Sequence, residues 1–373
     1  MTTKDSSQVA VAKLLQSANV EINGSRPWDI TIHDQRFYKR VLAKSSLGLG
    51  ESYMDGWWDC PALDQFFTNI LLSELNKKVR GDWKILLAGT RAKLFNLQTT
   101  SRAFQVGERH YDAGNDLFKG MLDRRMIYSC GYWKNATSLD TAQQNKLELI
   151  CQKLELKPGM KLLDIGCGWG GLVQYAAEKY GVECEGVTVS REQAKLAKDR
   201  MKNLPVKIIV QDYRAIREKY DRVVSVGMFE HVGHKNYRHF MKVVDNCLDP
   251  EGLFLLHSIG GNTTSTSMEP WLDKYIFPNG VLPSISQVGQ ASEGLFVMED
   301  WQNFGPDYDK TLMAWTDNFK KSWPEIKDNY DERFYRMWTY YLLSCAAGFR
   351  ARNTQLWQIV FSKKRKMRYD APR

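Results

Sequence analysis

The stretch Leu162–Gly171, LLDIGCGWGG, decides the fold of this chain. It follows a Lys-Pro-Gly turn at 157–159, begins as a short apolar run and then breaks into closely spaced glycines. An apolar run that ends in glycines and is followed by an amphipathic segment predicts a buried strand, a glycine loop and a helix. The candidate ligand-binding residues of this loop are Asp164, Gly166, Cys167, Gly168, Trp169, Gly170, Gly171 and Leu172.

Two ligands suit such a loop. Gly166, Gly168 and Gly171 have the spacing of the dinucleotide fingerprint, in which bare backbone lets a pyrophosphate approach a helix N-terminus. Asp164 favours S-adenosylmethionine instead, because a carboxylate before the first glycine repels a pyrophosphate but suits an ammonium and ribose hydroxyls. The stretch therefore predicts a methyltransferase-type site. A NAD site and a glycine turn without any ligand are the alternatives.

Composition restricts the class of protein. A chain of 373 residues with 43% hydrophobic content is long enough for two domains with real cores. No apolar run approaches the roughly twenty residues of a membrane span, and the first twenty residues are too polar for a signal peptide, so a cytoplasmic location is expected. Seven scattered cysteines without a CxxC pair predict free thiols and no metal cage. The net charge of +9 suits an anionic surface, either lipid or nucleic acid.

The pattern along the chain predicts two domains. Residues 1–100 are expected to form a small, mainly helical N-terminal domain that engages lipid or membrane, and residues 101–373 a catalytic domain. Within the first, residues 82–98 predict a basic amphipathic helix that could lie on a bilayer, although a stripe of this kind more often packs on the neighbouring domain. After the glycine loop, strands and helices alternate, which is typical of an α/β, doubly wound, Rossmann-like parallel sheet. Residues 261–310, rich in Ser, Thr, Pro and Gly, are expected to form a lid.

Ligands of such sheets bind at the carboxyl ends of the strands, so polar residues there are candidates. Thr188 and Gln193 follow the second strand, where a methyltransferase usually has an acidic residue for the ribose hydroxyls. Ser190 and Gln193 also match a capping box, which explains Gln193 without a ligand. Asp212 and Tyr213 follow the third strand and suit an adenine amino group and ring, although an aspartate there is also a common turn former.

Two further strand ends carry ionisable residues. The fourth is followed by Glu230, His231 and His234, whose spacing is not that of a zinc protease helix, so a buried hydrogen-bonding glutamate is favoured over a metal ligand. His257 ends an otherwise apolar fifth strand. A lone histidine there is usually a satisfied core residue, but this end of the strand faces the expected crevice.

Taken together, the motifs closely resemble the bacterial cyclopropane-fatty-acyl-phospholipid synthases of the mycolic acid cyclopropane synthase superfamily. The resemblance runs from about residue 13 to 362. It is carried by LLDIGCGWGG, GVTVSREQ, VSVGMFEHVG, LLHSIG, WLDKYIFPNG, DWQNFG and YDKTLMAW, with HYDAGNDLF, YSCGYW and SLGLGESYMDGWWD upstream. It implies the class I fold, with S-adenosylmethionine as methyl donor. It also implies methylenation of the cis double bond of unsaturated acyl chains in membrane phospholipids, through a carbocation.

The resemblance also implies the site. Donor contacts would fall on Tyr128, Ser129, the loop from Asp164 to Leu172, Thr188, Ser190, Gln193, Gln211, Asp212 and Tyr213. A bicarbonate ion, acting as the base, would be held by Cys130, Glu230, His257, the Ile259 backbone and Tyr308. Cys345 matches a position once proposed as catalytic, but its place in an amphipathic helix favours a core residue. A homodimer bound peripherally to the inner face of the cytoplasmic membrane, without nucleic acid, is implied as well.

Two other functions are left open by these residues. A methyltransferase of the same architecture could stop at a methyl-branched or hydroxylated chain, or act on another lipid. The chain could also be a silent, basic binding module for lipid or nucleic acid, although its intact Asp164, Glu230 and His257 count against that.

Overall fold

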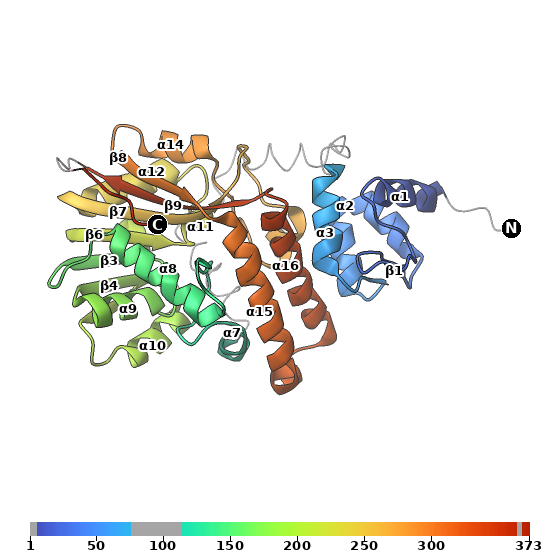
Figure 1. The fold of residues 1–373 in the computed structure, drawn as a ribbon, viewed down its shortest axis with the longest axis horizontal. Coiled ribbons are helices and arrows are strands. Elements are labelled where there is room, and N and C mark those ends of the chain that lie inside the picture. The colour runs from blue at the N-terminus through green and yellow to red at the C-terminus, as the bar shows by residue number, and fades with distance from the viewer. Residues whose placement is uncertain (1–5, 76–113, 364–367) are drawn as a thin grey trace.

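The structure, a computed structural model, describes residues 6–75, 114–363 and 368–373. Its centre is a seven-stranded sheet with the order β5-β4-β3-β6-β7-β9-β8 (Figure 1). Strands β3 to β7 pair in parallel, and β9 runs antiparallel to both of its neighbours. The strands are β3 (Lys161–Ile165), β4 (Glu183–Thr188), β5 (Val206–Val210), β6 (Tyr220–Val226), β7 (Leu248–Gly260), β8 (Val297–Asn303) and β9 (Gln355–Ser362). The predicted doubly wound sheet is confirmed, and its strand order reverses at β3 and β6.

Helices cover both faces of this sheet, because apolar residues of its strands point to either side and must be buried. Leu162 of β3 lies in a core with α8 (Leu139–Lys153), α9 (Gly171–Tyr180) and α10 (Arg191–Arg200). The next residue, Leu163, points to the opposite core, formed with α12 (Tyr237–Cys247) and α14 (Ile285–Ser292). The glycine loop after β3 therefore opens between two packed layers, at one edge of the sheet.

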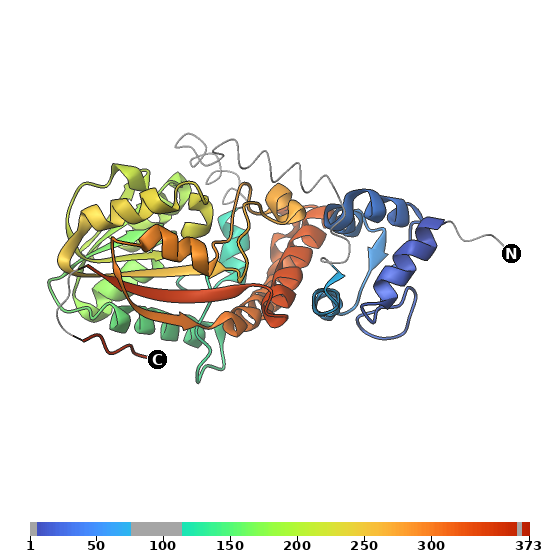
Figure 2. The same cartoon turned by 90° about the horizontal axis from the view of Figure 1, so that it is seen from above.

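The N-terminal residues pack on the long helices at one end of the sheet domain (Figures 1 and 2). They form α1 (Ser6–Gln16), α2 (Arg36–Met54), α3 (Leu63–Leu72) and a two-stranded sheet of β1 (Thr31–Ile32) and β2 (Trp58–Asp59). Together with α15 (Gly305–Ile326) and α16 (Glu332–Arg350) they bury one continuous apolar cluster. The expected amphipathic helix at 82–98 lies outside the described residues.

Several elements are not evident in the sequence. Helix α7 (Asn115–Met121) precedes the glycine loop and is not among the predicted elements, and β8 lies inside residues 261–310, the expected lid. Strand β8 is not predicted by an apolar run in the sequence, because it is an edge strand with charged and exposed residues. Short helices α11 (Phe229–Val232) and α13 (Pro270–Tyr275) complete the domain. Across the described ranges, no helix is both long and apolar enough to span a membrane.

Candidate active site

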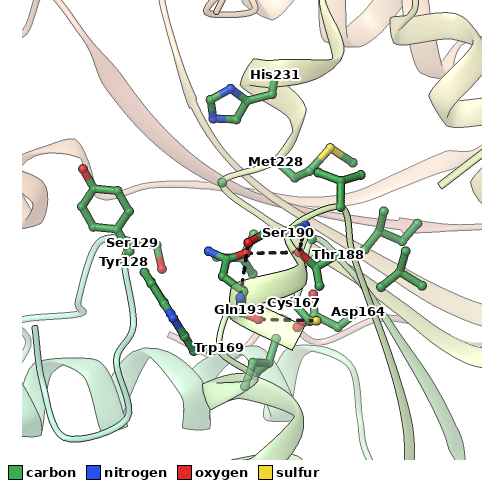
Figure 3. Close-up of a pocket in the computed structure, with 18 of the residues that line it drawn as sticks. Tyr128, Ser129, Asp164, Cys167, Trp169, Thr188, Ser190, Gln193, Met228 and His231 are labelled. Carbon is green, nitrogen blue, oxygen red and sulfur yellow. Dashed lines mark hydrogen bonds between the residues drawn. The ribbon is translucent and has the colours of Figure 1, made fainter. Parts of the chain in front are cut away.

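A cavity opens at the carboxyl ends of β3, β4, β5 and β6, where a doubly wound sheet binds its ligand. The expected donor residues that line it are Tyr128, Ser129, Asp164, Gly166, Cys167, Gly168, Trp169, Gly171, Leu172, Thr188, Ser190, Gln193, Gln211, Asp212 and Tyr213. Figure 3 shows Tyr128 and Ser129 on one side, Thr188, Ser190 and Gln193 across from them, and Trp169 between. Gly170 does not line the cavity; it precedes α9 and turns the chain. We call this space the donor cavity.

The glycine loop keeps its backbone open for a ligand. Gly166, Gly168 and Gly170 have φ of 95°, 55° and 81°, in the left-handed region that favours glycine. A Cβ on Gly166 would lie 2.8 Å from the Cβ of Met228, so no larger residue fits there without movement. The loop leads directly into the N-terminus of α9. This cradle suits a nucleoside that approaches the backbone closely.

Polar residues after β4 form a small network that faces the donor cavity. The Thr188 hydroxyl donates to Gln193 Oε1 at 3.1 Å and accepts from the Ser190 amide at 3.2 Å. Ser190 caps α10 by accepting from the Gln193 amide, but the Gln193 side chain turns to Thr188 instead of to the Ser190 backbone. The expected capping box is therefore only half formed. Its glutamine helps to shape the cavity instead.

The third strand end supplies an acceptor without a partner. Asp212 Oδ1 accepts from the Arg214 amide at 2.9 Å, so its expected turn role is real. Its other oxygen, Oδ2, is buried and has no hydrogen-bond partner among the described residues. The Tyr213 hydroxyl is also buried without a partner, and Gln211 lies beside them on the cavity wall. Buried polar atoms normally have a hydrogen-bond partner, and the amino group of an adenine could donate to Asp212 Oδ2.

Asp164 lines the donor cavity, and none of the described residues forms an ion pair with it. It is 2% exposed, and its Oδ1 has no hydrogen-bond partner. The pKa of Asp164 is raised to about 7, because the effect of burial is larger than the opposite effect of the positive charge of Lys146. Such a carboxylate gains most from a ligand that brings its own positive charge. The ammonium of S-adenosylmethionine would provide it.

A smaller cavity adjoins the first and shares Tyr128, Ser129, Gly227, His231 and Phe277 with it. Glu230, His257, Ile259 and Tyr308 line it, so four of the five residues expected to hold an anion come together there. They come from α11, β7 and α15, which are far apart in sequence. We call this space the anion cavity.

Glu230 and His257 line this cavity, and each has a buried polar atom without a hydrogen-bond partner among the described residues. Glu230 Oε1 accepts from the Ile259 amide at 2.7 Å, whereas Oε2 is buried without a partner, and burial raises the Glu230 pKa to about 7. The His257 Nδ1 lies 3.3 Å from the Gln358 amide nitrogen, and its Nε2 has no partner. Burial holds the His257 pKa well below its usual value, so the ring is neutral at pH 7. With Gln358 donating to Nδ1, Nε2 carries the hydrogen and can donate.

The two cysteines considered for the chemistry, Cys130 and Cys345, line neither the donor cavity nor the anion cavity. Cys130 is fully buried, and its thiol donates to the Gly131 carbonyl at 3.1 Å and accepts from the Thr311 hydroxyl at 3.8 Å. Burial raises its pKa well above normal, so it is a neutral thiol. Cys345 packs on the α16 side of the apolar cluster, and burial raises its pKa to about 12. Neither is placed as a nucleophile.

Sequence reasoning missed several cavity residues. Lys146 of α8 lines the donor cavity, as do His231 and the segment Ile276–Asn279 that follows α13. Only the motif WLDKYIFPNG hinted at that segment. Nothing local distinguishes Lys146 from the solvated lysines of an amphipathic helix. In the part of the chain that the structure describes, no three His, Cys, Asp or Glu residues gather as a metal site.

The sheet order, the glycine cradle and the acidic strand end define a class I S-adenosylmethionine-dependent methyltransferase. The chain belongs to the mycolic acid cyclopropane synthetase family, whose model matches residues 98–359. It is 58% identical to the cyclopropane-fatty-acyl-phospholipid synthase of Escherichia coli over 94% of this chain and 92% of that protein. The resemblance inferred from the motifs is confirmed.

Solved structures agree with this assignment. The cyclopropane synthase MmaA2 from Mycobacterium tuberculosis superposes with a TM-score of 0.67 at 30% identity, covering 72% of this chain and all of that one. The mycolic acid cyclopropane synthase CmaA1 in complex with SAH and CTAB gives 0.66 at 32% identity, covering 70% and 98%. The chain is therefore an enzyme of the S-adenosylmethionine-dependent methyltransferase class.

Proposed function

We propose that this enzyme adds a methylene group from S-adenosylmethionine across the cis double bond of unsaturated acyl chains in membrane phospholipids, forming cyclopropane fatty acyl chains. The observation that carries the proposal is the anion cavity, which adjoins the donor cavity and holds two buried, unpartnered polar atoms, Glu230 Oε2 and His257 Nε2. The identity to the Escherichia coli synthase, which extends over the N-terminal helices, supports the phospholipid substrate.

A small oxyanion fits the residues of the anion cavity. The His257 Nε2 hydrogen and the Tyr308 hydroxyl would donate to its oxygens, and Glu230 Oε2 would accept its remaining proton. Bicarbonate has both features, and when bound it would supply a small internal base for the proton that the transferred methyl group loses. The Ile259 amide already donates to Glu230 Oε1, so in this structure it orients the glutamate. Cys130 would support the cavity wall as a neutral thiol.

The remaining task of the protein side chains is to orient the acyl chain of the lipid and to exclude water from it. An alkene is a weak nucleophile without a polar handle, so the rate depends on its alignment with the sulfonium methyl and on stabilising the carbocation that follows. The anion cavity is lined by Ile259, Met268, Phe277, Leu282 and Leu356, which exclude water that would convert the cation to an alcohol. The rings of Tyr128, Tyr308, Phe277 and Tyr341 also line it and can face a cation.

We infer the remaining features from the same resemblance. The N-terminal domain, residues 1–100, would engage the membrane, and residues 101–373 would carry catalysis with a lid formed by residues 261–310. The enzyme would act as a homodimer on the inner face of the cytoplasmic membrane. The basic excess of the chain supports attraction to an anionic leaflet, where each nearby Lys or Arg contributes about 1 kcal/mol.

A vesicle assay tests the proposal. Purified protein is incubated with S-adenosylmethionine and vesicles of unsaturated phospholipid, with and without bicarbonate, and the acyl chains are analysed by mass spectrometry. We expect a gain of one CH₂ with loss of alkene reactivity, and a slower reaction after removal of bicarbonate. A methyl-branched or hydroxylated product would overturn ring formation, and equal rates in both buffers would overturn the role of bicarbonate.

A further inference from the structure

Lys146 is a buried cation on the wall of the donor cavity. It lies on the inner face of α8, is 1% exposed, and lines the same cavity as Asp164. Its ammonium donates to the Ser129 hydroxyl at 2.9 Å. Among the described residues, Asp123 and Asp164 are near enough to favour its charged form, but neither forms an ion pair with it. A buried charge normally has an opposite charge in contact, so Lys146 lacks its usual counter-ion.

The other buried lysine of the same helix shows the contrast. Lys153 is also fully buried, but its ammonium lies 3.1 Å from Asp300 Oδ2, and it lines neither cavity. That lysine has a structural counter-ion within the fold. Lys146, with the same chemistry two turns earlier, contacts the Ser129 hydroxyl and no carboxylate among the described residues, and it lines the donor cavity. Helix α8 therefore carries two buried lysines, of which Lys153 pairs with a carboxylate of the fold and Lys146 faces a ligand cavity.

The hydrogen-bonding inventory around Lys146 defines the ligand. An ammonium has three donors, of which one is used on Ser129. Because Ser129 accepts this bond, its own hydroxyl hydrogen is free to donate, and Ser129 lines both cavities. Gln143, also on α8, donates to the Ser129 carbonyl at 2.7 Å and fixes the loop that carries it. Two ammonium hydrogens and one hydroxyl hydrogen form a donor set for a carboxylate.

We propose that Lys146 and Ser129 bind the α-carboxylate of the methyl donor, while Asp164 binds its α-ammonium. The donor cavity would then recognise the amino-acid end of S-adenosylmethionine as a zwitterion, with one buried charge for each of its two charges. Lys146 is a donor-binding residue in this arrangement, and Gln143 is a positioning residue that acts through Ser129. The inference concerns donor binding alone and does not depend on the acyl substrate or on bicarbonate.

Calorimetry without lipid and without bicarbonate tests this arrangement. The ligands are S-adenosylhomocysteine, its carboxamide, which keeps the ammonium but lacks the carboxylate charge, and 5′-methylthioadenosine, which lacks the amino acid. For Lys146→Met we expect about 10- to 150-fold weaker binding of S-adenosylhomocysteine, as for one lost charge-assisted hydrogen bond. Binding of 5′-methylthioadenosine should change by less than about twofold. The matched control Lys153→Met should keep the wild-type preference between these ligands, even where its unfolding temperature falls.

If Lys146→Met does not fold, the wild-type protein alone still tests the proposal, through its binding of the carboxamide compared with S-adenosylhomocysteine. Wild-type protein should bind it at least about tenfold more weakly than S-adenosylhomocysteine, because Lys146 and Ser129 present only donors. Equal binding of the two ligands by the wild type would overturn the proposal. So would equal weakening of all three ligands in a folded Lys146→Met, which would indicate a structural role, and so would unchanged binding of S-adenosylhomocysteine in that variant.

Discussion

Replacement of Glu230 by Gln tests the chemistry of the anion cavity most directly. The amide oxygen can still accept from the Ile259 amide, as Oε1 does now at 2.7 Å, so the side chain should keep its place. The change converts the unpartnered acceptor Oε2 into an NH₂ donor and removes a buried negative charge. One charge-assisted hydrogen bond contributes about 1.5–3 kcal/mol, which corresponds to a loss in kcat of about 10- to 150-fold.

The assay compares two measurements on the same preparations. Ring formation is followed by mass spectrometry of vesicle acyl chains, and binding of S-adenosylhomocysteine by calorimetry. Binding should change by less than about threefold, because Glu230 lines the anion cavity and not the donor cavity. Glu148→Gln is the matched control, since that carboxylate accepts from the Tyr175 and Tyr180 hydroxyls and lines neither cavity. Parallel losses of binding and ring formation in Glu230→Gln would refute the assignment of Glu230 to the chemistry.

Three further outcomes are expected. Gly166→Ala should weaken donor binding at least about tenfold in calorimetry, because its φ of 95° and the 2.8 Å approach of Met228 leave no room for a methyl group. Burial raises the pKa of both Asp164 and Glu230 to about 7, above their unfolded values, so these two carboxyls bind protons more tightly in the folded protein and lower its stability as pH rises from about 4 to 7. Burial lowers the pKa of His231 and His257, which act in the opposite direction over this range, so the test is a difference between variants: Glu230→Gln should shift the slope of unfolding temperature against pH upward relative to the wild type. An unchanged slope in Glu230→Gln would contradict the burial of its carboxyl. Cys345→Ala should lower stability by about 1 kcal/mol and leave kcat within about twofold; a hundredfold loss would make the thiol catalytic.

Donor binding should itself depend on pH, because the two charges proposed to hold the amino acid are opposite. Burial raises the pKa of Asp164 to about 7 and lowers that of Lys146 to about 8. Affinity for S-adenosylhomocysteine should therefore rise as Asp164 ionises and fall again as Lys146 loses its proton. Affinity for 5′-methylthioadenosine, which has neither charge, should stay flat over the same range. A flat profile for both ligands would contradict recognition of the zwitterion.

Local sequence was enough to predict the glycine loop, the sheet class and most of the polar residues that line the donor cavity. These are local properties: an apolar run, glycines at positions of positive φ and polar residues at strand ends all occur within a few residues of one another. The motifs around Glu230, His257 and Tyr308 also identified the family. The capping box at Ser190 shows the limit of such reasoning, because the glutamine had a nearer partner in Thr188, which lies outside the motif.

Only the tertiary structure decided which charges lack a partner. Lys146 and Lys153 lie on one helix and are equally buried. Lys153 forms an ion pair with Asp300 of β8, a strand that the sequence did not predict, whereas Lys146 lines the donor cavity. Likewise, the Ile259 amide was expected to face the anion, but the fold directs it to Glu230. Burial and pairing depend on residues that are distant in the chain and become neighbours only when the layers pack, so no local pattern encodes them.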